Sequence, residues 1–93
     1  MSPELKLAYY RKSDWGKFLQ SVADRDTVHD TWEEWNKAYE KAKKNLKKQG
    51  AVVHEITIDI DELKRYCNDR GLKNDGRTRS QYVARLPLTR TKT

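Results

Sequence analysis

Hydrophobic residues recur along this chain at two spacings, one typical of helices and the other of strands. The longest helical pattern occupies the middle of the chain, where apolar side chains are separated by four, three, four, three and four residues: Val28, Trp32, Trp35, Tyr39, Ala42 and Leu46. This spacing puts them on one face of a helix of about five turns. Thr27 or Asp26 is expected to cap its start and Gly50 its end.

Alternating residues predict two strands. Positions 52–60 alternate between an apolar and a polar side: Val52, His54, Ile56, Ile58 and Ile60 share one side. We expect a strand with one buried face there, and the central helix should pack on it with Trp32 and Trp35 largely buried. Residues 5–10 also alternate and predict a shorter strand, although Ser2-Pro3-Glu4 resembles a helix start and leaves a helix over 4–11 as the alternative.

A short helix is predicted between the first strand and the central helix. Ser13-Asp14 is expected to open it, and Trp15, Phe18, Leu19 and Val22 fall on one of its faces. The acidic stretch 24–26 is expected to end it.

Two further helices are predicted after the second strand. Asp59 or Asp61 is expected to cap the first, which Gly71 ends, and Asn74 or Asp75 to cap the second, which Pro87 ends. The inward residues are expected to be Leu63, Tyr66, Cys67, Tyr82, Val83 and Leu86. The basic residues expected to face outward are Arg77, Arg79 and Arg85.

The predicted order is therefore β-α-α-β-α-α, a helix-rich α+β domain over residues 1–88 with a flexible tail at 89–93. A two-stranded sheet is marginally stable by itself. Either helices cover the strands, or they pair with the strands of a second copy in a homodimer.

The excess positive charge lies in the last quarter of the chain. The chain has a net charge of +6, and from Arg70 onward seven basic residues accompany the single acid Asp75. Such a basic end is typical of proteins that meet nucleic acid. The predicted backbone-binding residues are Lys73, Arg77, Arg79, Arg85, Arg90 and Lys92. The lysines near the end of the central helix either extend this surface or only complement the helix dipole.

Residues 63–86 resemble the SAP module, a small helix–extended turn–helix unit that binds DNA. The resemblance rests on Leu63-Lys64, Gly71-Leu72, Gly76 and Arg85-Leu86. Its last part is offset by about one position, and Thr78 stands where that pattern tends to carry Lys. The resemblance implies DNA binding by these two helices; the alternative is that the glycines only end and begin two packed helices.

A wider resemblance covers most of residues 5–86. It rests on Asp14-Trp15, Thr31-Trp32-Glu33-Glu34-Trp35, residues 58–63 leading to Tyr66-Cys67, and residues 75–79. These segments resemble a small family of bacterial proteins. The resemblance implies a compact bacterial cytosolic protein and brings no activity with it.

Other chemistry has little support in the sequence. Cys67 is the only cysteine, so no disulfide forms within the chain, and with His29 and His54 it does not offer the spacing of a zinc site. We expect no metal and no cofactor. The chain has no apolar run of membrane-spanning length and no signal-peptide pattern, so a cytoplasmic location is expected.

Three functions follow, in order of support. The first is a non-enzymatic protein that binds DNA or RNA through its basic C-terminal end. The second is a protein–protein adaptor or regulatory subunit whose basic edge meets an acidic partner. The third, distant, is a small RNase-like toxin acting through His54, Tyr82 and Arg77.

Overall fold

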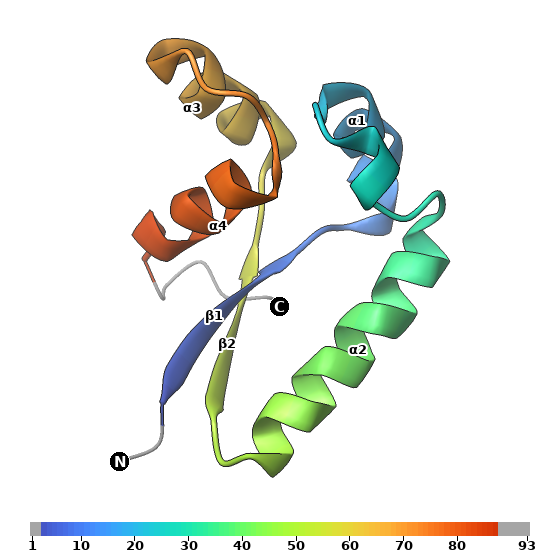
Figure 1. Ribbon diagram of the computed structural model, residues 1–93, viewed down its shortest axis with the longest axis vertical. Helices are drawn as coiled ribbons and strands as arrows, with labels where there is room; N and C mark the ends of the chain where they lie inside the picture. The colour runs from blue at the N-terminus through green and yellow to red at the C-terminus, as the bar shows by residue number, and fades with distance from the viewer. Residues whose placement is uncertain (1–2, 88–93) are drawn as a thin grey trace.

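The computed structural model describes residues 3–87 (Figure 1). Its strands are β1 (Glu4–Tyr9) and β2 (Val52–Thr57), and its α-helices are α1 (Trp15–Ser21), α2 (Trp32–Lys48), α3 (Ile60–Arg70) and α4 (Gly76–Arg85). Two short 3-10 helices, η1 (Lys12–Asp14) and η2 (Arg25–Thr27), precede α1 and α2. The predicted helix-rich α+β fold with a two-stranded sheet is confirmed. The tail at 89–93 lies outside the described residues.

The sheet consists of two parallel strands. β1 pairs with β2 in register from Glu4 opposite Val52 to Tyr9 opposite Thr57. Residues 4–9 therefore form a strand and not the alternative helix. Parallel strands require a long crossover, which α1 and α2 provide. Since paired residues share a face, the even-numbered residues of both strands lie on one side and the odd-numbered residues on the other.

Both faces of the sheet are covered by helices (Figure 1). On the odd-numbered face, the Tyr39 hydroxyl of α2 donates a hydrogen bond of 2.8 Å to Glu55 Oε1. On the even-numbered face, Lys6 Nζ donates to the carbonyl oxygens of Ala84 and Leu86 at the end of α4, at 2.9 and 2.6 Å. The prediction of a single buried strand face was therefore incomplete, because α2 and α4 enclose the sheet from opposite sides.

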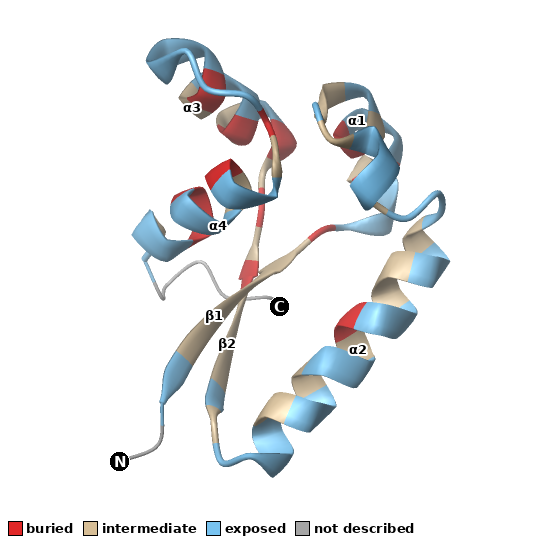
Figure 2. Cartoon of the chain, viewed as in Figure 1, coloured by how far each residue is buried: buried red, intermediate tan, exposed pale blue. Residues whose placement is uncertain are grey.

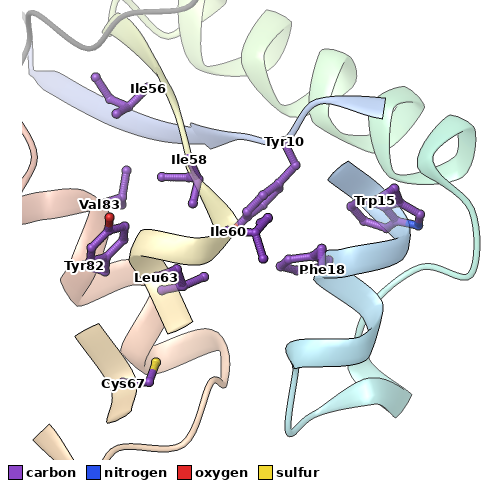
Figure 3. Packing of buried hydrophobic residues seen from close by; sticks show 10 residues of the cluster. All are labelled: Tyr10, Trp15, Phe18, Ile56, Ile58, Ile60, Leu63, Cys67, Tyr82 and Val83. Carbon is purple, nitrogen blue, oxygen red and sulfur yellow. The ribbon is translucent and has the colours of Figure 1, made fainter. Parts of the chain in front are cut away.

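The main core lies between the even-numbered face of the sheet and helices α1, α3 and α4 (Figures 2 and 3). Its buried apolar residues are Tyr10, Trp15, Phe18, Ile56, Ile58, Ile60, Leu63, Cys67, Tyr82 and Val83. Trp32 and Trp35 of α2 pack against this cluster and are partly buried, so both contribute to the core as expected but are not among its fully buried residues. They lie at the margin of the core, where the first turns of α2 pass the end of β1.

Helix α2 begins later than its apolar pattern predicted. Thr31 is its N-cap: the Thr31 Oγ1 accepts a hydrogen bond of 3.2 Å from the Glu34 backbone N–H. Thr27, one of the predicted caps, instead donates its hydroxyl to Asp24 within η2. Residues 28–31 therefore precede the helix, and the Thr-x-x-Glu sequence at 31–34 caps its start, since the Thr31 hydroxyl also donates to Glu34 Oε1 at 3.0 Å.

Candidate nucleic-acid interface

Helices α3 and α4 form the pair joined by a tight turn that the sequence predicted. Asp59 caps α3 by accepting from the Glu62 N–H at 3.1 Å, and Asp75 caps α4 by accepting from the Thr78 N–H at 2.9 Å. Gly71 ends α3 with a φ of 62°, in the left-handed region that favours glycine. The turn between the helices is thus fixed at both ends by local chemistry.

Arg79 does not face solvent. Its side chain is only 11% exposed, and it makes a two-pronged ion pair with Asp24, with Nη1–Oδ1 and Nη2–Oδ2 distances of 2.9 Å each. Nη1 also donates to the Asn74 carbonyl oxygen at 2.9 Å. The prediction that Arg79 faces outward was wrong, because a carboxylate 55 residues away in the chain takes up its guanidinium. Both terminal nitrogens of Arg79 are engaged within the fold, so this residue does not belong to the candidate interface.

Asp24 is the centre of this arrangement. The hydrogen bonds from Arg79 hold the pKa of Asp24 at about 2, below its ordinary value of 3.8. Asp24 Oδ2 also accepts from the Gly76 backbone N–H at 3.1 Å and from the Thr27 hydroxyl at 2.8 Å. The start of α4 is therefore fixed to the segment that joins α1 to α2, and this contact sets which side of α4 faces solvent.

Besides Lys64 and Arg65 in the middle of α3, four basic residues are exposed at the end of α3, in the turn and on α4, and these four are Arg70, Lys73, Arg77 and Arg85. We call this set the α3–α4 basic face. Lys73 and Arg77 line a hollow of about 350 Å³ together with Gln81. Of the other predicted residues, Arg90 and Lys92 lie outside the described part of the chain.

Two guanidinium groups of this face converge on one aromatic ring. The Cζ atoms of Arg70 and Arg85 lie 4.3 and 5.4 Å from the centre of the Tyr66 ring, and the Tyr82 ring supports Tyr66 at 5.0 Å. Cation–π contacts of this kind hold a guanidinium in place without using its N–H donors. Within residues 3–87, neither Arg70 nor Arg85 forms an ion pair with a carboxylate. Both keep donors available for an anion.

The sequence prediction omitted Arg70 and Tyr66 from the site. The spacing of four residues between them was visible on the predicted helix and is the usual spacing of interacting pairs. The approach of Arg85 to the same ring depends on how α3 and α4 pack. No local pattern in the sequence predicts this contact between Arg85 and the Tyr66 ring.

The candidate catalytic residues have separate surroundings. His54 Nε2 lies 3.2 Å from Glu4 Oε1 on the sheet, and the Tyr82 hydroxyl donates to Glu62 Oε2 at 3.4 Å. Arg77 is exposed in the first turn of α4. Within residues 3–87, His54 and Tyr82 thus contact two different glutamates, Glu4 on β1 and Glu62 on α3.

Cys67 is buried, and burial raises the pKa of its thiol. We therefore expect a thiol reagent to label the folded protein at least about tenfold more slowly than the urea-unfolded chain at pH 8, because the reactive thiolate is scarce and shielded. Equal labelling rates would contradict a buried, inert thiol. Among residues 3–87, no three His, Cys, Asp or Glu side chains are grouped so that they could hold a metal ion.

Comparison with known proteins adds no functional information. No protein-family model, curated protein or solved structure matches this chain. The resemblances to the SAP module and to a bacterial family stay predictions. Within the described part of the chain, no helix combines the length and apolar character needed to cross a membrane.

Proposed function

We propose that this protein is a non-enzymatic nucleic-acid-binding protein that holds the phosphate backbone with its α3–α4 basic face. The observation that carries the proposal is that Arg70 and Arg85 gather around Tyr66 with no carboxylate partner in residues 3–87. Arginine is suited to this role because its planar group can donate two parallel hydrogen bonds to a phosphate.

Backbone contact has more support than base recognition. The exposed side chains of α4 between Arg77 and Arg85 are short or uncharged, including Ser80, Gln81 and Ala84. Phosphate contacts fix a protein on nucleic acid but carry no sequence information. The protein should therefore bind unrelated sequences with similar affinity.

The first test is the salt dependence of binding. If the four cations of the α3–α4 basic face each contact a phosphate, log K should fall against log[salt] with a slope between about −3 and −4, because each contact releases a condensed counterion. Fluorescence anisotropy with unrelated duplex and single-stranded oligonucleotides at several salt concentrations measures this slope. The double variant Arg77→Gln/Arg85→Gln should weaken binding to all of them and bring the slope closer to zero by about 2.

A matched control separates this face from net charge alone. Lys12 and Arg25 form exposed ion pairs with Glu33 and Asp30. The variant Lys12→Gln/Arg25→Gln removes the same charge as the interface variant, and it should leave the affinity within about twofold if binding is local. Equal weakening by both variants, or binding no tighter than millimolar at low salt, would reject the proposal and favour the protein–protein adaptor.

A further inference from the structure

A second line of positive charge runs along α2. Lys37, Lys41, Lys44 and Lys48 are all exposed and are separated by four, three and four residues. At 3.6 residues per turn they form one line about 16 Å long on the side of the helix opposite Trp35 and Tyr39. We call these four residues the α2 lysine line.

Two of the acids near this line, Glu33 and Glu40, are paired with lysines that do not belong to it, Lys12 and Lys43. Lys43 Nζ lies 2.9 Å from Glu40 Oε2 and 3.1 Å from Glu55 Oε1, and its side chain is only 17% exposed. Its hydrogen bonds with Glu40, ahead of those with Glu55, raise the pKa of Lys43. Within residues 3–87, none of the four lysines of the line forms an ion pair. Their charge is therefore available to a partner.

The helix dipole explains only part of this pattern. The attraction of the C-terminal end of a helix for cations falls off within the last turn. It accounts for Lys47 and Lys48, which belong to that turn. It does not account for Lys37 and Lys41, which lie two or more turns earlier on the same line.

The α2 lysine line and the α3–α4 basic face point in different directions. Helices α2 and α4 lie on opposite sides of the two strands (Figure 1). Tyr39 of α2 contacts the odd-numbered face of the sheet through Glu55, whereas Lys6 on the even-numbered face contacts the end of α4. The lysines lie on the side of α2 away from the sheet, and Arg77 and Arg85 lie on the exposed side of α4. One straight nucleic-acid segment cannot contact both surfaces.

We propose that the α2 lysine line is a second nucleic-acid-binding surface and that one molecule bridges two separate nucleic-acid segments. This inference rests on the proposed function of the α3–α4 basic face. The chemistry of the second surface is simpler, since lysines are flexible point charges without the planar geometry of arginine. The α2 lysine line is therefore suited to contact the phosphate backbone of a nucleic acid of any sequence, and salt should weaken this binding strongly.

A two-duplex capture assay tests the bridge. One duplex is fixed to beads, the protein is added at low salt, unbound protein is washed away, and a second, fluorescent duplex is applied. The wild-type protein should retain the second duplex. The variant Lys37→Gln/Lys41→Gln/Lys44→Gln should still bind the first duplex but retain roughly tenfold less of the second. The control Lys12→Gln/Lys17→Gln/Arg25→Gln removes three charges from exposed ion pairs elsewhere and should retain both duplexes.

Each outcome bears on one proposal. Wild-type protein that binds the bead duplex but retains no second duplex would overturn the bridge and leave the proposed function standing. Unchanged capture by the lysine variant would overturn it too, because the bridge would then use another surface or two copies of the chain. Absence of binding to the first duplex would reject the proposed function itself.

Discussion

Replacing Asp24 by alanine should lower the free energy of unfolding by about 3 kcal/mol, because it leaves the Arg79 guanidinium largely buried without its carboxylate. The same substitution removes the acceptor of the Gly76 N–H at the start of α4 and of the Thr27 hydroxyl. Urea unfolding followed by tryptophan fluorescence measures the loss. Asp26→Ala is the matched control: Asp26 is exposed two residues away, and its replacement should change stability by less than about 0.5 kcal/mol.

The contribution of Asp24 to the free energy of unfolding should also fall at low pH. Its pKa is about 2 in the folded protein against an ordinary 3.8, so the folded state favours the ionised carboxylate. The stabilisation is therefore complete above about pH 4 and is lost as the pH falls toward 2. The difference in stability between the wild type and Asp24→Asn should shrink over that window. A constant difference, or equal effects of Asp24→Ala and Asp26→Ala, would mean that the ion pair contributes little.

Because of this ion pair, only some of the arginines can be replaced in a test of nucleic-acid binding. Arg79→Ala should destabilise the fold for the same reason as Asp24→Ala, so weaker binding by that variant would report unfolding and not a lost phosphate contact. Arg77 and Arg85 are exposed and can be replaced without breaking a described ion pair. The interface is accordingly tested at these two positions.

The elements of the fold could largely be predicted from the sequence, because their determinants are local. Asp59, Gly71 and Asp75 act as the cap residues that their types indicated. The start of α2 was predicted too early, since Val28 has the apolar spacing of the helix but precedes it. Periodicity alone does not separate a residue packed before a helix from one inside it, and the N-cap residue Thr31 is the more local and more reliable sign.

The candidate site was predicted less well because it depends on long-range packing. The sequence indicated a basic end but not which cations are neutralised inside the fold. The partner of Arg79 is 55 residues away, and Arg85 meets Tyr66 only because α3 and α4 pack together. Alternation likewise predicted two strands, but not that α2 and α4 would lie on opposite faces of the sheet. That placement separates the lysines of α2 from the arginines of α4.

Trp35 should matter more to stability than its half-buried position suggests. Its ring lies within 6.2 Å, centre to centre, of five other aromatic rings: Tyr9, Tyr10, Trp15, Trp32 and Tyr39. These ring contacts join α2 to β1 and α1. Tyr39 is the one buried residue of α2, so the helix has few other buried side chains that could hold it in place. Trp35→Ala should therefore cost about 3 kcal/mol, the lower end of the range for emptying a large aromatic site.

A conservative variant distinguishes packing from surface recognition. Trp35→Phe keeps a ring among the same neighbours and should cost less than about 1.5 kcal/mol. Thermal and urea unfolding of both variants measure the two losses, and far-UV circular dichroism checks that the helices persist. A loss below about 0.5 kcal/mol for Trp35→Ala would be typical of an exposed side chain. The aromatic edge of α2 would then be a surface for a protein partner, and the adaptor hypothesis would gain support over nucleic-acid binding.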